Sequence, residues 1–232
     1  MALAASAMLA AASLVGCGSD EREPAKGATT VTAGGVVVEA IVRQPGASPE
    51  ADPLPTVLFL HGAAYTSRIW DDRGILDAVA NAGHRAVAID LPGYGETPKR
   101  PAGAGVDASS DGTWLRSLIE ELGGPEQVVL VSPSMSGRFS LGYLAEFPDD
   151  ALAGFVPIAP VTIDAVRSAD APPVPTMIVW GEDDDKPLAE ADALAKQFPG
   201  SSIEVISDGS HAAYDDEPEA FIALLVKFLG QL

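Results

Sequence analysis

A cluster of three serines lies between an apolar segment and an amphipathic segment near the middle of the chain. The apolar residues 128–131 predict a buried strand, and Ser132, Ser134 and Ser136 follow at alternate positions. A strand–turn–helix context with small residues on both sides of a central serine is typical of a turn that exposes that serine as a nucleophile. A serine-rich helix N-terminus would give the same local pattern. Ser134 is therefore a candidate nucleophile that needs supporting residues elsewhere.

The chain has three histidines that could serve as its base. A serine hydroxyl is a poor nucleophile at neutral pH and needs a neighbouring base, usually a histidine that a carboxylate orients. His84 lies between a predicted helix and a predicted strand, which favours packing or capping. His61 directly follows the predicted strand 57–60, which favours a structural role or one in the loop there. His211 follows the predicted strand 203–206, so it should lie at the carboxyl edge of a parallel sheet, and we expect it to be the base.

An acidic run follows the predicted strand 177–180, and spacing has to select the carboxylate that orients the base. Glu182 and Asp183 should occupy the tight turn directly after the strand, whereas Asp185 should face solvent. Asp184 is therefore the expected acid. A divalent-metal loop is a weaker interpretation, because the run lacks the spaced ligands and the turn glycine of a calcium-binding loop.

Backbone N–H donors are a second requirement, because acyl transfer develops negative charge on the carbonyl oxygen. Met135 directly follows the candidate nucleophile and would supply one donor. The loop after the predicted strand 57–60 would supply the other, and Ala63 is the expected residue. Tyr65 and Tyr214 are candidate substrate-binding residues, although packing beneath the loops would explain them equally well. The chemistry requires no metal and no organic cofactor.

Short apolar segments alternate with amphipathic segments from about residue 31 onward. This alternation predicts an α/β class of fold: a mostly parallel central sheet with helices on both faces. The connection between the strands at 155–158 and 177–180 is too short for a lid domain, so we expect an open site. Asp215 and Asp216 are expected in the first turn of the last helix. The other predicted strands are 36–42 and 86–89, and the predicted helices are 69–82, 109–122, 137–147, 188–198 and 217–229.

Composition narrows the classes of partner. The chain has 232 residues, 47% hydrophobic and 20% charged, which suits a single domain with one sizeable core. Its 14 Lys and Arg residues against 33 Asp and Glu residues give a formal charge of −19. A nucleic-acid partner would meet like-charge repulsion, so we expect none. We expect a monomer that acts on a small acyl substrate.

The N-terminal segment carries the single cysteine, Cys17, which excludes an intramolecular disulfide and a cysteine-based zinc site. Cys17 ends an uncharged, alanine-rich run, and the sequence LVGC at 14–17 resembles the lipobox of bacterial lipoproteins. The apolar residues 2–15 are too few to span a bilayer. The resemblance implies a signal peptide at 1–16, a lipid on Cys17, a flexible tether at 17–30 and a folded domain at 31–232. It places the protein in the bacterial cell envelope, outside the cytoplasm, with membrane contact only through that lipid.

Several motifs resemble the α/β-hydrolase superfamily over about residues 31–232. They are LFLHG at 58–62, AIDLPGYG at 88–95, WGEDD at 180–184 and GSH at 209–211, together with the turn at Ser134. The segments SPSMSG at 132–137 and FVPIAP at 155–160 are more narrowly similar to the CIB group, which comprises compact hydrolases of the ABHD-fourteen type without a lid. Serines flank the nucleophile in that group, whereas glycines are usual elsewhere.

The resemblance implies a serine hydrolase that cleaves a small acyl ester, amide or thioester. Ser134 would attack, His211 would move the proton and Asp184 would orient the imidazole, in the chain order expected for this fold. Two alternatives stay open at this point. One is an acyltransferase that uses the same three residues, and the other is a non-catalytic surface lipoprotein that binds a partner.

Overall fold

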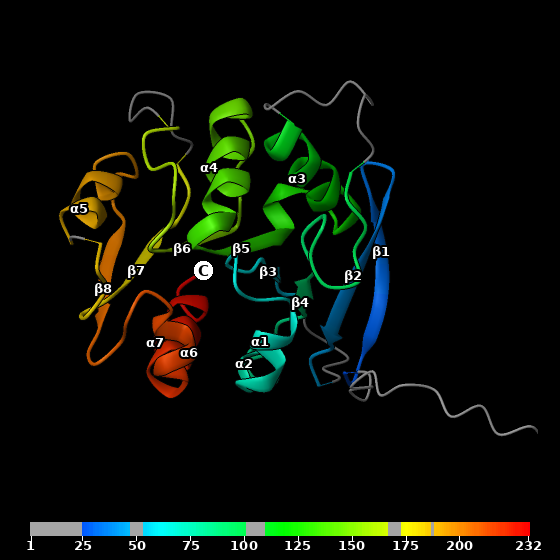
Figure 1. The fold of residues 1–232 in the computed structure, drawn as a ribbon, viewed down its shortest axis with the longest axis horizontal. Helices are drawn as coiled ribbons and strands as arrows, with labels where there is room; N and C mark the ends of the chain where they lie inside the picture. The colour runs from blue at the N-terminus through cyan, green and yellow to red at the C-terminus, as the bar shows by residue number, and fades with distance from the viewer. Residues whose placement is uncertain (1–24, 47–52, 101–109, 167–172, 187) are drawn as a thin grey trace, which may run out of the picture.

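A computed structural model describes residues 25–46, 53–100, 110–166, 173–186 and 188–232. In this part of the chain, eight strands form one sheet in the order β1-β2-β4-β3-β5-β6-β7-β8 (Figure 1). The β1–β2 and β2–β4 pairs are antiparallel, and all pairs from β4 to β8 are parallel. The strands are β1 (Ala28–Ala33), β2 (Val36–Arg43), β3 (Thr56–Phe59), β4 (Ala86–Ile89), β5 (Val128–Pro133), β6 (Gly154–Ile158), β7 (Met177–Gly181) and β8 (Ser202–Ile206).

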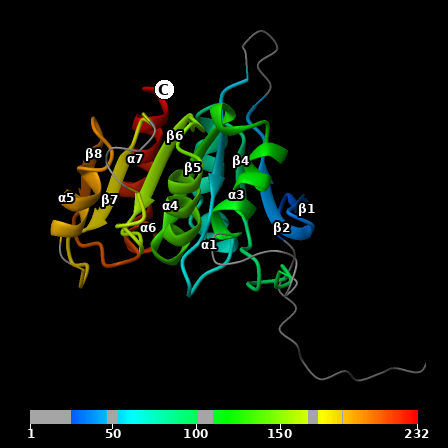
Figure 2. The ribbon, with the colours of Figure 1, turned by 90° about the horizontal axis from the view of Figure 1, so that it is seen from above.

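Helices cover both faces of the sheet, as Figures 1 and 2 show from two directions. One face carries α3 (Ser110–Glu121), α4 (Gly137–Glu146) and α5 (Ala189–Ala195). The other face carries α1 (Arg68–Asp72), α2 (Ile75–Asn81), α6 (Ala213–Asp216) and α7 (Pro218–Leu229). Short 3₁₀ turns precede and follow β5, η1 (Pro125–Gln127) and η2 (Ser134–Ser136).

Two apolar layers fill the space between the sheet and its helices. In β3, Val57 and Phe59 belong to the layer that also holds Trp70 of α1. Leu58 points to the opposite layer, which holds Leu115 of α3. Because helices cover both faces, the central strands consist almost entirely of buried apolar residues instead of alternating with polar ones. This continuous hydrophobicity is the reason that the sequence predicts these strands well.

The first strand, β1, was not predicted. It pairs antiparallel with β2, with Ala28 opposite Ile41, and most of its side chains are exposed. The threonine-rich sequence of an edge strand carries little hydrophobic signal, because only one side of it faces the core. The ordered fold therefore begins before the expected boundary at residue 31, and the predicted tether at 17–30 is wrong for its last residues, which form part of β1.

The predicted helix 69–82 is wrong as a single element, because the chain forms α1 and α2 instead. Gly74 separates them with a left-handed φ of 69°, which glycine adopts without steric cost. Asp215 and Asp216 likewise belong to the separate helix α6, not to the first turn of α7 as predicted.

The predicted signal peptide at 1–16 and the lipid attachment site Cys17 lie outside the described residues. Within the described ranges, no helix combines the length and apolar character needed to cross a membrane.

Candidate active site

The turn after β5 places Ser134 at the carboxyl edge of the sheet. Ser134 has a φ of 48°, a left-handed conformation that residues other than glycine rarely adopt. The backbone N–H of Val161, in the loop after β6, donates to the carbonyl oxygen of Ser134 at 3.0 Å. The next helix packs closely on the same loop, because a Cβ on Gly137 would lie only 2.5 Å from the Val161 carbonyl oxygen. The turn thus has the strained, tightly packed form expected of a nucleophile turn.

Three predicted side chains form one continuous hydrogen-bonded series. The Oγ of Ser134 lies 2.8 Å from Nε2 of His211, and Nδ1 of His211 lies 2.9 Å from Oδ2 of Asp184. A carboxylate can only accept, so Nδ1 carries the proton that it donates to Asp184. Nε2 is then free to accept the hydroxyl proton of Ser134. This is the tautomer in which a histidine can act as a general base toward a serine.

The structure selects one carboxylate from the acidic run. Glu182 and Asp183 form the turn after β7, and Asp185 is exposed, as predicted. The side chain of Asp184 is only 1% exposed, against 40% for His211. Its second oxygen, Oδ1, accepts the backbone N–H of Lys186 at 2.9 Å. Both oxygens of Asp184 therefore have donors, which holds the carboxylate in one orientation.

Glycine at the end of β7 allows the acid loop and the histidine loop to touch. A Cβ on Gly181 would lie 2.1 Å from the carbonyl oxygen of Ser210, next to His211. The backbone N–H of Asp183 donates to the Gly209 carbonyl at 2.9 Å. This close backbone approach sets the separation between Asp184 and His211.

The loop after β3 lies against Ser134. A Cβ on Gly62 would lie 3.8 Å from the Cβ of Ser134. Among the described residues, the backbone N–H groups of Ala63 and Met135 have no hydrogen-bond acceptor. Two unpaired N–H donors in segments that flank a nucleophilic serine are the arrangement that an oxyanion site requires.

His61 is bound at both ring nitrogens inside the protein. Its Nε2 accepts the backbone N–H of Leu91 at 3.0 Å, so the proton resides on Nδ1, which donates to the Gly62 carbonyl oxygen at 2.8 Å. Burial lowers the pKa of His61 below its ordinary value of 6.5, which outweighs the opposing effects of the Gly62 carbonyl and of Asp90. His61 is a neutral structural histidine in the loop, within the roles that the sequence predicts for it.

Comparisons with known proteins show the family to which the chain belongs. Residues 55–173 match the alpha/beta hydrolase fold family. The rat and human proteins named ABHD14B are 37% and 38% identical to the chain over 181 residues. Their names describe them as candidate protein-lysine deacylases. Each alignment covers 76% of this chain and 84% of the relative. The chain belongs to the α/β-hydrolase family.

Solved structures show the same fold. A CIB-like hydrolase from Thermoplasma acidophilum superposes with a TM-score of 0.74 at 22% identity, over 88% of this chain and 98% of that one. The esterase RhEst1 from Rhodococcus superposes with a TM-score of 0.71 at 17% identity, over 89% and 99% of the two chains. The predicted fold class and the resemblance to the CIB group are confirmed. The described loops of this α/β-hydrolase also contain no lid domain.

The two tyrosines predicted to bind substrate differ in exposure. Tyr214 is 2% exposed, and its ring stacks on Trp70 with centroids 4.6 Å apart, so it packs beneath the site. Tyr65 is half-buried, and its hydroxyl donates to Oδ2 of Asp215 at 2.9 Å. Burial and the adjacent Asp215 carboxylate raise the pKa of Tyr65 to about 12, which keeps its hydroxyl protonated. Tyr65 is the better placed of the two to contact a substrate.

Asp215 links α6 to residues beside α1, whereas Asp216 holds the loop that carries His211. Asp215 accepts hydrogen bonds from Tyr65 and from Arg73, which lies between α1 and α2. Oδ2 of Asp216 accepts the backbone N–H of Ser210 at 2.8 Å and the Ser210 hydroxyl at 2.5 Å. These roles were not predicted from the sequence. For the contact of Asp216 with Ser210, the short spacing between the two residues was the available signal.

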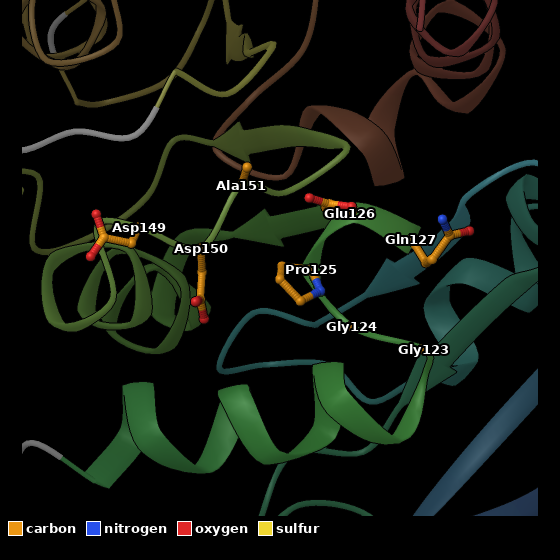
Figure 3. Close-up of a pocket in the computed structure, with 8 residues that line it drawn as sticks. All are labelled: Gly123, Gly124, Pro125, Glu126, Gln127, Asp149, Asp150 and Ala151. Atoms are coloured by element: carbon orange, nitrogen blue, oxygen red, sulfur yellow. The ribbon is translucent and has the colours of Figure 1, made fainter.

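A surface pocket of about 380 Å³ lies at the opposite end of β5 from Ser134 (Figure 3). Its one partly buried carboxylate, Asp150, already binds Arg116 and the hydroxyl of Tyr143. Within the described ranges, no group of three or more His, Cys, Asp or Glu residues is arranged to hold a metal ion. The pocket is lined by Gly123, Gly124, Pro125, Glu126, Gln127, Asp149, Asp150 and Ala151.

Proposed function

We propose that this α/β-hydrolase is a serine hydrolase that cleaves a small acyl ester, amide or thioester. The observation that carries the proposal is the position of His211, whose two ring nitrogens lie 2.8 Å from Ser134 Oγ and 2.9 Å from Asp184 Oδ2. A structural serine in a strained turn would not need a histidine and a buried carboxylate aligned behind it.

The proposed reaction has two halves. His211 Nε2 takes the hydroxyl proton while Ser134 Oγ attacks the acyl carbonyl, and the N–H groups of Ala63 and Met135 stabilise the oxyanion. Imidazolium forms next to the Asp184 carboxylate and gives its proton to the leaving group. Water then attacks the acyl-enzyme with His211 again as the base, which releases the acid and restores Ser134.

Water is the expected acyl acceptor because the base is open to solvent. The side chain of His211 is 40% exposed, and the described loops place no helical domain over it. The deacylase description of the ABHD14B relatives concerns amide bonds of lysine, which belong to the same substrate class. The alternative is transfer of the acyl group to an amine or thiol. Product analysis by mass spectrometry, with and without such an acceptor, separates the two.

The direct test of the proposal is covalent labelling with a fluorophosphonate probe. The full chain should be labelled once, and peptide mapping should locate the adduct on Ser134. Labelling should disappear in His211→Gln, because the hydroxyl then loses its base. A folded wild-type chain that takes no label, or a label on another residue, would reject the proposed function and favour the binding-protein alternative.

We expect His61 to act through the oxyanion loop. The Gly62 carbonyl that it binds belongs to the same peptide group as the Ala63 N–H, so their directions are coupled. In His61→Asn the side-chain NH₂ group can still donate to the Gly62 carbonyl. In His61→Gln the longer side chain places its amide oxygen where it accepts the Leu91 N–H, and the bond to Gly62 is lost. Losing the Gly62 bond should lower kcat by about ten- to a hundredfold, so His61→Gln should be much the slower variant on p-nitrophenyl acetate.

The matched control for His61 is His84→Gln. His84 is also buried, and its Nδ1 binds the backbone carbonyl of Pro55, away from the site. It should leave kcat unchanged. Equal activity of the two His61 variants would contradict the assignment.

A pH dependence of stability should follow from the lowered pKa of His61. Below pH 6.5 this histidine takes up a proton in the unfolded chain but resists it in the folded protein. The free energy of unfolding should therefore decrease as the pH is lowered, and less steeply in His61→Asn.

We also propose that Cys17 carries a lipid that anchors the hydrolase in the bacterial envelope. The proposal depends on the LVGC sequence at 14–17. After expression in a bacterium, mass spectrometry of the membrane fraction should find a diacylated N-terminal Cys17, and Cys17→Ala should abolish both the lipid and the membrane association. A wild-type chain that retains Met1 and fractionates with the cytosol would contradict the anchor.

A further inference from the structure

Three serine hydroxyls lie buried directly beneath the nucleophile turn. Ser132, Ser136 and Ser140 are all fully buried. The Oγ of Ser132 lies 2.7 Å from the Oγ of Ser140 and 3.1 Å from the Oγ of Ser136. The Oγ of Ser136 lies 2.7 Å from the carbonyl oxygen of Pro133. Because an unpaired buried hydroxyl is costly, each of the three protons needs an acceptor.

The direction of these hydrogen bonds follows from counting protons and from the distances, because Ser140 Oγ lies nearer to Ser132 Oγ than to the Ser136 carbonyl. Each hydroxyl has one proton, and the Pro133 carbonyl can only accept, so Ser136 donates to Pro133. Ser136 Oγ then accepts the proton of Ser132, and Ser132 Oγ accepts that of Ser140. The other acceptor near Ser140, the carbonyl of Ser136, is farther away at 3.4 Å. The result is a single chain that runs from Ser140 through Ser132 and Ser136 to Pro133, here called the hydroxyl chain.

The hydroxyl chain ends on the peptide group that precedes the nucleophile. The Pro133 carbonyl and the Ser134 N–H belong to one planar peptide, so holding the carbonyl also restrains φ of Ser134. That φ is 48°, in a region that L-residues avoid. On the other side of the nucleophile, the Val161 N–H holds the Ser134 carbonyl at 3.0 Å. Both peptides that determine the direction of the Ser134 side chain are therefore held, one by Ser136 within the turn and the other by Val161 from outside it.

We propose that Ser136 is a positioning residue for Ser134, and that Ser132 and Ser140 direct the Ser136 hydroxyl toward the Pro133 carbonyl. The inference rests on the proposed function, because it concerns how Ser134 Oγ stays within reach of His211 Nε2. In the common Gly-x-Ser-x-Gly turn the flanking residues have no hydroxyl. In this hydrolase, by contrast, the turn has an internal hydrogen-bonded support.

The order of residues in the hydroxyl chain predicts how strongly each substitution lowers kcat. Ser136→Ala removes the bond to Pro133 and the acceptor of Ser132, so kcat for p-nitrophenyl acetate should fall by more than about tenfold, with KM within about twofold. Ser140→Ala leaves Ser132, Ser136 and Pro133 connected, so kcat should fall by less than about threefold. Ser136→Cys keeps a weak S–H donor and should recover part of the loss.

The matched control is Ser201→Ala. The Oγ of Ser201 is also buried but has no hydrogen-bond partner among the described residues, and it precedes β8 at the other edge of the sheet. All variants should be made in the full chain and assayed well below their unfolding temperatures, with the fluorophosphonate labelling rate as a second readout. The control should match the wild type in both kcat and labelling.

Three outcomes would overturn the inference. These are a wild-type kcat in Ser136→Ala, a loss in Ser140→Ala as large as in Ser136→Ala, and a loss that merely follows the unfolding temperature across all variants. If Ser136→Ala does not fold, the kcat of Ser136→Cys is compared with that of Ser140→Ala instead. A wild-type kcat in Ser136→Cys overturns the inference. A kcat in Ser136→Cys below that of Ser140→Ala supports it. A wild-type chain that takes no label would reject the proposed function instead, so the two failures are distinguishable.

Discussion

Replacing Ser134 with alanine is expected to lower kcat for p-nitrophenyl acetate by roughly 10⁶-fold and to abolish covalent labelling. The substitution removes only the Oγ that lies 2.8 Å from His211 Nε2, and with it the atom that would bond to the acyl group. His211→Ala should cost about as much, because the nucleophile and its base act as one unit. The double variant should therefore be no slower than either single variant. Steady-state kinetics with active-site titration would measure these losses.

Folding controls make the Ser134 result decisive. Ser134→Ala should unfold at nearly the wild-type temperature, because the Val161 N–H still holds the carbonyl of residue 134. It should also bind a non-hydrolysable acyl analogue with nearly wild-type affinity. If Ser134→Ala retained turnover above about a thousandth of the wild-type rate, far more than binding and the oxyanion donors alone supply, Ser134 would not be the nucleophile.

The Asp184→Asn substitution is expected to lower kcat by about 10⁴-fold while the fold stays intact. An amide presents an N–H group where the carboxylate accepts, so the His211 ring would reorganise its proton toward Nε2 and lose its capacity to accept from Ser134. The buried position of Asp184 strengthens the effect, since solvent cannot replace the carboxylate at 1% exposure. KM should change little, because Asp184 has no direct contact with Ser134.

Asp183→Asn and Asp185→Asn are the matched controls for Asp184. Both carboxylates are exposed and lie on the same loop, so they report on the general effect of removing one negative charge there. Their kcat values should stay within about twofold of the wild type, because exposed charges are screened by solvent. An equal loss in all three variants would assign the effect to loop charge and contradict the role of Asp184.

The residues of the site were predictable because they follow strand ends. Ser134, Asp184 and His211 come directly after three apolar segments, and the carboxyl ends of parallel strands lie at one edge of the sheet. Asp184 could also be chosen over its neighbours from local sequence, because Glu182 and Asp183 form the tight turn after the strand. Element boundaries failed where the local signal was weak, as in the exposed strand β1 and at Gly74.

Contacts between distant segments were not predictable. Tyr65 and Asp215 are 150 positions apart, and nothing near either residue indicates that their side chains meet. The same holds for the neutral tautomer of His61, which depends on the Leu91 N–H. Such bonds arise only when the sheet order brings separate loops together at one edge.

Local patterns in the sequence were enough to predict the alternation of strands and helices, and from it the fold class and the candidate nucleophile, base and acid. These follow from hydrophobic patterning and turn chemistry, which act over a few residues. Three features required the folded structure: the direction of the hydroxyl chain, the hydrogen bonds of Asp215 and Asp216, and the burial that separates Tyr214 from Tyr65. Each of these depends on the distances and proton positions of groups that folding brings together, and chain order does not encode them locally.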